Sequence, residues 1–391
     1  MKTTSLMVLA AGLVNGFPGF QDLKSRAAEL ETRGTDELLG DLRTLPSDRL
    51  TRTGTDIRNL LIGRGVPEEL FNTYIFTPPR DSAACRADTC CIWKHIANVM
   101  RREMIGSAGR CNNLARQCVR IGFHDAGSWS KSNGLGGGAD GSIILARECY
   151  TREIHRGLES GCDRIQVWYD EFKQYGISMA DLIQFAANVA TVTCPLGPRV
   201  RTFVGRKDSS EPAPDGLLPE PTDSADKLIA LFLDKTISPD ELVALVGAHT
   251  TAQQFFFDTS RAGDPLDSSP GVWDVKFYGQ VRGPFTPARV VKLPSDVSLS
   301  RDPRTRGTWN LFSGLITGQI PWNLAYARAY IRLSLLGVDN INELQECTKA
   351  LPLPLSSFIS PDQPLLDAFA NGFMSSARDQ VLQGDRITPG F

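Results

Sequence analysis

The sequence lacks several features that mark common classes of protein. It has only four histidines among 391 residues, contains no Cys-x-x-Cys pair, and has no basic run interleaved with aromatic residues. The missing cysteine pairs argue against a structural zinc site. The formal charge of −2 gives no indication of nucleic-acid or membrane partners. A small uncharged substrate is compatible with this composition.

The N-terminus carries an apolar segment from Leu6 to Val14 that is too short to cross a bilayer. A lysine precedes it and small and turn residues follow up to Gly19, which is typical of a secretory signal; a buried N-terminal helix is the alternative. We therefore expect residues 1–19 to be a signal peptide and the protein to be secreted and extracellular. In an oxidising compartment, the nine cysteines are disulfide candidates before they are metal ligands.

The rest of the chain divides by its helical patterns and turn residues. Residues 20–84 are helical in pattern but poor in aromatics and contain a Pro-Pro pair near their end, which predicts either a propeptide or an appended helical segment. From residue 85 to about residue 354 helical periods dominate, so this domain is predicted to be mostly α. Repeated prolines then predict an irregular C-terminal tail over 355–391.

Three stretches give clear helix signals. Ser178 precedes Asp181 by three residues, a start that resembles a capping box. Ser238 and Pro239 suit a cap and a first helical position before an apolar face. A further long helix is predicted to end at the stop signal Gly337.

The stretch VRIGFHDAG, residues 119–127, concentrates an arginine, a histidine and an aspartate. If residues 112–126 are helical, Arg120 and His124 are four apart and share a face, while Asp125 points about 100° away. One face then offers a base beside a fixed cation, and the other offers a carboxylate. A solvated Arg–His pair on a surface helix is the plainer alternative, and apolar neighbours such as Phe123 argue against it.

Two of the four histidines are followed by a loop rich in oxygen ligands. The first loop, GLGGGADGS, lacks the Gly-Lys ending of a phosphate-binding loop, so a hard cation such as calcium is the better interpretation. A lone histidine on an apolar helical face is often a core residue, and the loop after it is what singles out His249. The candidate ligands are Asp125, Asp140 and Ser142 near the first histidine, and Thr250, Asp267, Ser269 and Asp274 near the second.

Together these motifs resemble the secreted fungal haem peroxidases called class II, within the plant peroxidase superfamily. The resemblance covers about Cys85 to Pro354 and includes RIGFHDAG with GGGADGS, GAHT, PAPDGLLPEP (212–221) and SDVSLSRD (295–302). It implies a mostly α, plant-type peroxidase fold whose helices enclose a haem between a distal and a proximal half. It also implies that hydrogen peroxide drives the oxidation of small phenolic or aromatic donors, in one-electron steps through a haem ferryl intermediate.

The resemblance also implies a role for each matching residue. His124 would be the acid–base group for peroxide, Arg120 would stabilise the charge that builds as the O–O bond breaks, and Phe123 would flank the iron. His249 would bind haem b as the iron ligand, with Asp296 accepting its other ring N–H.

Two Ca²⁺ ions and a set of disulfides are implied in the same way. The distal calcium would take Asp125, Gly138, Asp140 and Ser142, and the proximal calcium would take Thr250, Asp267, Ser269, Val272 and Asp274. The family's bridges match Cys85–Cys91, Cys90–Cys347 and Cys111–Cys194; Cys149 and Cys162 are close enough in sequence to pair, which leaves Cys118 as a buried thiol.

The chain departs from the specialised members of the family. Manganese-oxidising members have carboxylates where Asn113, Gln117 and Phe255 stand, so no manganese site is expected. Ala244 occupies the position of the surface tryptophan that other members use for bulky aromatics. We expect a generic, monomeric peroxidase.

Three questions stay open at the level of sequence. An asparagine normally orients the distal histidine of the family, and here either His155 or Glu159 falls at that position. A catalytically silent, calcium-stabilised extracellular scaffold is a second possible function. A catalase-peroxidase-like enzyme is a third, although it would carry tryptophans where Phe123 and Leu266 stand.

Overall fold

A computed structural model of the chain describes residues 35–132 and 136–388. The predicted signal peptide and the beginning of the predicted N-terminal extension lie outside these residues. Among the helices described, none is long and apolar enough to cross a bilayer.

Helices form almost all of the regular structure, which confirms the predicted fold class. The α-helices are α3 (Arg52–Leu61), α4 (Ala83–Arg86), α5 (Thr89–Met104), α6 (Asn113–Ala126), α7 (Ser142–Leu145), α8 (Glu148–Thr151), α9 (Glu159–Phe172), α10 (Met179–Thr193), α11 (Ala225–Asp234), α12 (Pro239–Val246), α13 (Lys276–Arg282), α14 (Pro294–Arg301), α15 (Arg306–Phe312), α16 (Gln319–Leu333), α17 (Gln363–Ala370) and α18 (Arg378–Leu382). Short 3-10 helices include η3 (Glu153–His155) and η5 (Gly247–Thr251).

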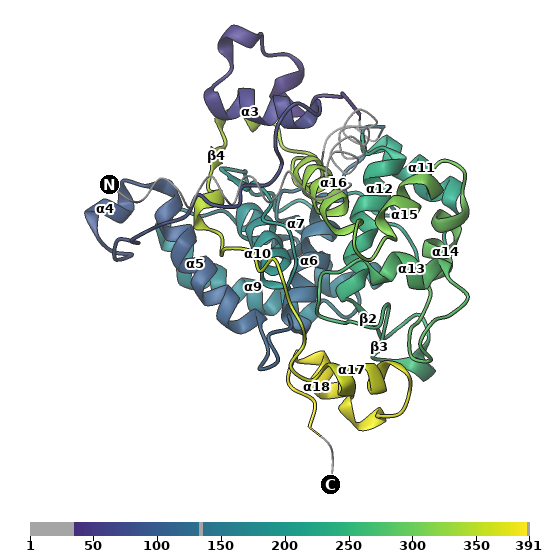
Figure 1. The fold of residues 1–391 in the computed structure, drawn as a ribbon. Coiled ribbons are helices and arrows are strands. Elements are labelled where there is room, and N and C mark those ends of the chain that lie inside the picture. The colour runs from purple at the N-terminus through teal and green to yellow at the C-terminus, as the bar shows by residue number, and fades with distance from the viewer. Residues whose placement is uncertain (1–34, 133–135, 389–391) are drawn as a thin grey trace, which may run out of the picture.

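Within residues 35–132 and 136–388, the strands form two antiparallel ribbons with two residues in each strand. In the first, β1 (Phe203–Val204) pairs with β4 (Gln345–Glu346), with Phe203 opposite Glu346. In the second, β2 (Gln253–Gln254) pairs with β3 (Asp264–Pro265), with Gln253 opposite Pro265. Figure 1 shows α5, α6, α9 and α10 gathered on one side of the molecule and α11 to α15 on the other.

Helix α10 is the centre of the first group, and all of its residues are buried. Its sequence is apolar nearly all round, as expected of a helix surrounded by other helices. It packs closely on α6, where a Cβ at Gly122 would lie 2.6 Å from the Cβ of Ala187. The side chain of Gln184 donates a 3.0 Å hydrogen bond to the carbonyl of Gly122. These contacts hold the helix that carries His124.

The predicted helix starts are present, with one difference. Ser238 and Glu241 cap each other reciprocally, through hydrogen bonds of 3.2 and 2.8 Å, and begin α12. Ser178 accepts from the backbone N–H of Asp181 at 3.0 Å. The carboxylate of Asp181 instead forms a 2.9 Å ion pair with Arg206. The Asp181 side chain therefore does not bond back to the cap residue, and the capping box is incomplete.

Gly337 does not end its helix, because α16 ends four residues earlier. It has a φ of +75°, and a Cβ there would lie 2.2 Å from the carbonyl oxygen of Gly137. The glycine therefore permits a close approach to the glycine-rich loop after α6.

Part of the predicted N-terminal extension belongs to the main core. Leu39, Leu42, Ile57 and Leu60 are almost completely buried in it. The buried guanidinium of Arg332 donates to backbone carbonyls of this segment, at 2.8 Å to Glu37 and 2.7 Å to Leu61. A buried charge without such partners would be costly, so α16 and this segment stabilise each other.

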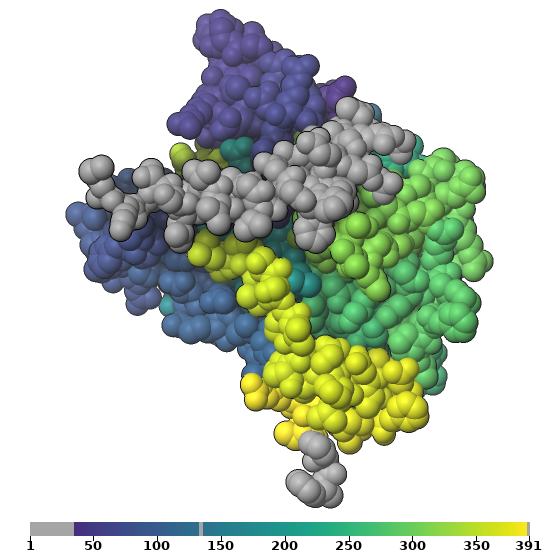
Figure 2. Space-filling model, viewed as in Figure 1, coloured from purple at the N-terminus to yellow at the C-terminus, as the bar shows by residue number. Residues whose placement is uncertain are grey.

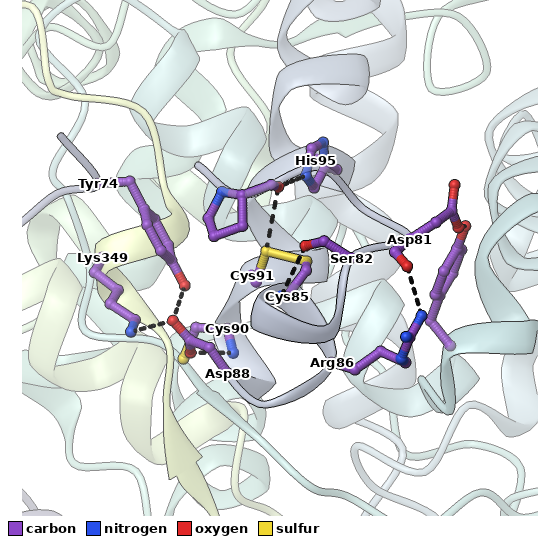
Figure 3. Close-up of a disulfide and its surroundings, with 12 residues drawn as sticks. Tyr74, Asp81, Ser82, Cys85, Arg86, Asp88, Cys90, Cys91, His95 and Lys349 are labelled. Carbon is purple, nitrogen blue, oxygen red and sulfur yellow. Dashed lines mark hydrogen bonds and ion pairs between the residues drawn. A yellow bond between two sulfur atoms is a disulfide. The ribbon is translucent and has the colours of Figure 1, made fainter. Parts of the chain in front are cut away.

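The segment that leads into α5 is tied to the body at Asp88 (Figure 3). Its carboxylate accepts from the Tyr74 hydroxyl at 2.7 Å and from the Lys349 ammonium at 2.8 Å. Nearby, Cys85, Cys91 and His95 lie within metal-binding distance of one another. The two thiols are joined in a disulfide and the His95 ring bonds the Pro78 carbonyl at 2.9 Å, so this group is not a metal site.

The predicted irregular tail contains two helices. Pro364 stands in the first turn of α17, where proline favours a helix start rather than a break. α17 and α18 share a small core of their own that includes Leu366, Phe369 and Val381. The C-terminal segment runs over the surface to these helices, which lie at the opposite end of the molecule from α3 (Figure 2).

The predicted disulfides are confirmed. The structure contains Cys85–Cys91, Cys90–Cys347, Cys111–Cys194 and Cys149–Cys162, and leaves Cys118 as a buried free thiol.

Candidate functional site

The first site lies on the last turns of α6. Asn112 caps the helix by accepting from the backbone N–H of Ala115 at 3.2 Å. Arg120 and His124 share a face of this helix, and Nε of the arginine donates to Nε2 of the histidine at 3.1 Å. His124 is buried. The structure therefore places the base and the fixed cation in direct contact.

The loop after α8 closes over these two side chains. The guanidinium of Arg120 donates to the carbonyls of Ile154 and Arg156 at 3.1 and 3.2 Å. Nδ1 of His124 lies 2.9 Å from Nδ1 of His155, which belongs to η3 between those two carbonyls. Glu159, the other residue left open by the sequence, is exposed. Of these two residues, the structure places His155 beside His124.

Phe123 lies beside this pair. Its ring meets the His124 imidazole edge-on at 5.7 Å and stacks on Phe232 of α11 at 6.1 Å. The stacking joins the helix group around α10 to the group around α12.

Burial is the main cause of the lowered pKa values of the basic groups in this site. Burial, and then the charge of Arg120, lowers the pKa of His124 well below the ordinary imidazole value of 6.5. Burial, and then the charge of Arg152, lowers the pKa of His155 to about 4. Burial also lowers the pKa of Arg120 to about 10. At neutral pH the arginine is thus charged while both imidazoles are neutral, so His124 can accept a proton.

The second site lies just beyond α12, in η5. Nδ1 of His249 lies 3.2 Å from Oδ2 of Asp296, a buried residue on α14. The ring of Phe277 meets the imidazole edge-on at 5.7 Å. The His249 side chain is 36% exposed, and within the described residues its Nε2 makes no hydrogen bond. This nitrogen has the chemistry that an iron ligand requires, and its partner carboxylate fixes the ring.

Further contacts join residues that lie on or next to the histidine-bearing elements. The buried Arg116 of α6 donates to the carbonyl of Thr251 at the end of η5, at 3.3 Å. The guanidinium of Arg156 lies 4.6 Å from the centroid of Phe256, close to β2. Neither contact was foreseen. The loop with Arg156 lies between Cys149 and Cys162, and the possible bridge between these two cysteines was the one indication in the sequence that this loop is held in place.

The carboxylates of Asp125, at the end of α6, and of Asp140, in the loop that follows, lie near each other. The Asp125 carboxylate accepts from the backbone N–H of Gly141 at 3.2 Å, and Asp140 accepts from that of Ser142 at 3.0 Å. Burial, and then the charge of Asp140, raises the pKa of Asp125 well above 3.8. The hydroxyl of Ser142 is buried with no hydrogen-bond partner in the described chain. Gly138 has a φ of +106°. Crowded carboxylates and an unpartnered hydroxyl fit a Ca²⁺ ion.

A similar cluster lies beside His249. The Thr250 hydroxyl donates to Asp267, and the Ser269 hydroxyl donates to Asp274 at 2.7 Å. Burial, and then the charge of Asp274, raises the pKa of Asp267 well above 3.8. Val272 lies in the same turn, where its backbone N–H donates to the Ser269 carbonyl at 3.0 Å. This set of hydroxyl, carboxylate and carbonyl oxygens also fits Ca²⁺.

Neutral side chains stand at the positions where the resemblance implied neither a manganese site nor a surface tryptophan. The Gln117 amide donates to the Gly157 carbonyl and to the Ser160 hydroxyl, both at 2.9 Å. The Phe255 ring is in contact with Phe256, 6.3 Å between centroids. Ala244, which stands where other members of the family have a surface tryptophan, is completely buried.

Comparisons with known proteins agree on one family. A family profile described as "Peroxidase" matches residues 95–314, which include every candidate residue above. The chain is 35% identical to ligninase C of Trametes versicolor, over 63% of this chain and 71% of that protein. It is 33% identical to manganese peroxidase 3 of Phlebia radiata, over 68% and 77%, and 31% identical to a peroxidase of Arthromyces ramosus, over 70% and 79%.

Proposed function

The chain belongs to the peroxidase family, and from this membership we propose that it oxidises small phenolic and aromatic donors one electron at a time at the expense of hydrogen peroxide. Family membership makes it a haem peroxidase of the fungal class II type. The donor, the electron count and the residue roles are our proposals. The observation that carries them is the His249 imidazole, held by Asp296 at one nitrogen and without a hydrogen bond at the other among the described residues.

We propose that His249 binds the iron of haem b and that Asp296 keeps its ring oriented. The carboxylate also raises the basicity of the ligand, because it accepts the other ring proton. One oxygen of Asp296 is buried without a partner in the described chain, which leaves its charge directed to the imidazole. Bound haem would supply the redox chemistry that splits peroxide and oxidises the donor.

His124 would take the proton from peroxide and return it to the departing oxygen. It is suited to this because it is neutral at working pH and its Nε2 already faces a donor rather than an acceptor. Arg120 uses three of its five N–H groups on His124 and the loop carbonyls. The remaining two are available to a negatively charged peroxide oxygen. Phe123 would keep water away from this side.

We propose two structural calcium ions, with the ligand sets implied by the family resemblance. The distal ion would join α6 to the loop around Asp140, and the proximal ion would join η5 to the loop around Asp267. The raised pKa values of Asp125 and Asp267 support this, because a divalent cation relieves the repulsion between buried carboxylates. Each ion would fix the helix end that carries a functional histidine.

We also propose that residues 85–354 form the peroxidase domain of a secreted, monomeric protein with a signal at 1–19. The extension before residue 85 would then be a permanent structural part rather than a propeptide, since its described portion contributes Leu39 and Ile57 to the main core.

A comparison of three donors tests the function. With hydrogen peroxide present, the purified haem-loaded protein is expected to oxidise a small phenol but neither manganese(II) nor a bulky veratryl-type alcohol; the same mixtures without peroxide are the control. Rapid manganese oxidation would contradict the interpretation of Asn113, Gln117 and Phe255. Failure to oxidise any donor with haem bound would contradict the proposed function itself.

A further inference from the structure

We propose that Arg156 and Phe256 form a surface binding site for small aromatic carboxylates, so that phenols with an acidic side group are better donors than neutral phenols. This inference rests on the proposed function, which takes small phenols as donors without regard to their charge. The observation behind it is the guanidinium of Arg156, which lies 4.6 Å from the centroid of the exposed Phe256 ring.

The two residues come from the two histidine-bearing parts of the chain. The backbone carbonyl of Arg156 accepts from the guanidinium of Arg120 at 3.2 Å, so it contacts the arginine of the first site directly. Phe256 follows β2, seven residues after His249. A molecule that touches both Arg156 and Phe256 is therefore held where these two parts of the chain meet.

The ring of Phe256 packs directly against the loop that carries Arg156. Gly157 has a φ of +83°, and a Cβ there would lie 2.4 Å from Cε2 of the ring. The carbonyl of this glycine accepts from the Gln117 amide at 2.9 Å, which ties the loop to α6. The Phe255 ring lies 6.3 Å from that of Phe256. Although it is supported in this way, Phe256 stays 43% exposed, which leaves an apolar surface for the ring of a donor.

The guanidinium of Arg156 has hydrogen-bond donors to spare. In the described part of the chain it forms one ion pair, at 3.1 Å to Glu153, and both side chains are exposed. A guanidinium has five N–H groups, so this pair leaves four of them for a ligand. Exposed pairs of this kind contribute little. The geometry therefore allows Arg156 to bind a second carboxylate through two parallel N–H groups.

Together the two groups favour one class of ligand, an aromatic ring with a carboxylate. The ring packs on Phe256 while the carboxylate pairs with Arg156, and a benzoate or cinnamate that carries a phenol group has both. Two such phenols each lose one electron and one proton from the hydroxyl, and one hydrogen peroxide is reduced to two waters. The carboxylate takes no part in this reaction and serves only in binding.

A matched pair of donors tests the charge. Ferulate, a phenolic cinnamate, and its methyl ester share the ring and the phenol and differ in the carboxylate. The readout is the ratio of the KM for ferulate to the KM for the ester, measured with the haem-loaded protein at low ionic strength. In Arg156→Gln this ratio should rise about fivefold, the contribution of a charge-assisted pair at the surface. Arg156→Lys keeps the charge without the planar fork and should give a smaller rise.

Two further variants make the test specific. Arg147→Gln removes another exposed guanidinium that lies over an aromatic ring, 5.2 Å from the centroid of Tyr150, and should leave the ratio as it is. Glu153→Gln removes the competing carboxylate and should lower the ratio. An unchanged ratio in Arg156→Gln, an equal rise in Arg147→Gln, or a rise in Glu153→Gln would overturn the proposal.

Binding can also be measured without turnover. Dimethoxycinnamate has the carboxylate but no phenol, and its methyl ester is the neutral control. The line widths of the ligand NMR signals give the Kd for each compound. We expect the acid to bind more tightly than the ester, and this difference to shrink in Arg156→Gln and at high salt. Equal affinities in the wild type would refute the inference even if phenols were oxidised normally. Failure to oxidise either phenol would instead refute the proposed function, while the binding data still decided whether the site exists.

Discussion

Removing the disulfide Cys149–Cys162 should lower both the stability of the protein and its reaction with peroxide. The bridge closes a loop with a sequence separation of 13 residues, for which the loss of loop-closure entropy corresponds to about 3 kcal/mol. With an unfolding entropy of about 2.1 cal/mol/K per residue, the Cys149→Ser, Cys162→Ser variant should unfold about 4 °C lower than the wild type. The loop carries His155, so we also expect a loss of about tenfold in the rate constant with peroxide.

The bridge Cys85–Cys91 offers a matched control. It spans a separation of 6 residues, so its removal should cost a similar amount, about 2 kcal/mol. It joins α4 to α5, and the residues labelled around it in Figure 3 include none of the candidate site residues. Calorimetry gives the stability of both double variants, and stopped-flow absorbance gives the peroxide step. Equal losses of the peroxide reaction in both variants, or an unchanged reaction in the Cys149→Ser, Cys162→Ser variant, would contradict the inference that this bridge holds the loop with His155 in place.

Three other perturbations have expected outcomes. Chelation of calcium with EGTA should lower the unfolding temperature by several degrees. Each occupied site would add about 2.7 kcal/mol to the free energy of unfolding when the free calcium concentration is about 100 times the Kd of the site. An unchanged unfolding temperature would contradict both calcium sites. His249→Ala should abolish the Soret band, whereas Asp296→Asn should keep haem with roughly 10- to 100-fold lower affinity or activity; a normal spectrum in the alanine variant would exclude the proposed ligand. The pKa of His155 is lowered to about 4 in the folded chain, so on acidification the unfolded chain binds the proton first. The stability of the folded protein should therefore fall as the pH drops from about 6.5 to about 4. In thermal scans, the unfolding temperature of His155→Asn should depend less on pH over this range, and the same dependence as in the wild type would contradict the lowered pKa.

Local features of the fold were predictable because they depend on neighbours in the chain. The cap at Ser238 and the shared face of Arg120 and His124 follow from helical spacing alone. Pro364 was wrongly interpreted as a residue that prevents a helix, whereas it stands in the first turn of one. The residue type alone does not distinguish these two roles of proline, because they differ in the conformation of the residues that follow. Gly337 was misinterpreted for a related reason: its positive φ serves a contact with Gly137, 200 residues away in the chain.

The parts of the site that depend on distant segments were not predictable in the same way. His155 and Glu159 are four residues apart, and only the path of the loop decides which one meets His124. The burial of Leu39 and the hydrogen bond from Arg332 to the Glu37 carbonyl likewise depend on packing between segments far apart in the chain. Spacing gave no signal for either, because both contacts are set by tertiary packing.

In the proposed mechanism, His124 accepts and returns the proton of peroxide while His249 binds the iron. Its most direct test is the second-order rate constant for the peroxide-driven Soret change in wild-type protein and in His124→Leu, at equal haem content. We predict a loss of about 10²- to 10⁴-fold, the usual contribution of a positioned acid–base group. A leucine variant that reacts with peroxide as fast as the wild type would contradict the account.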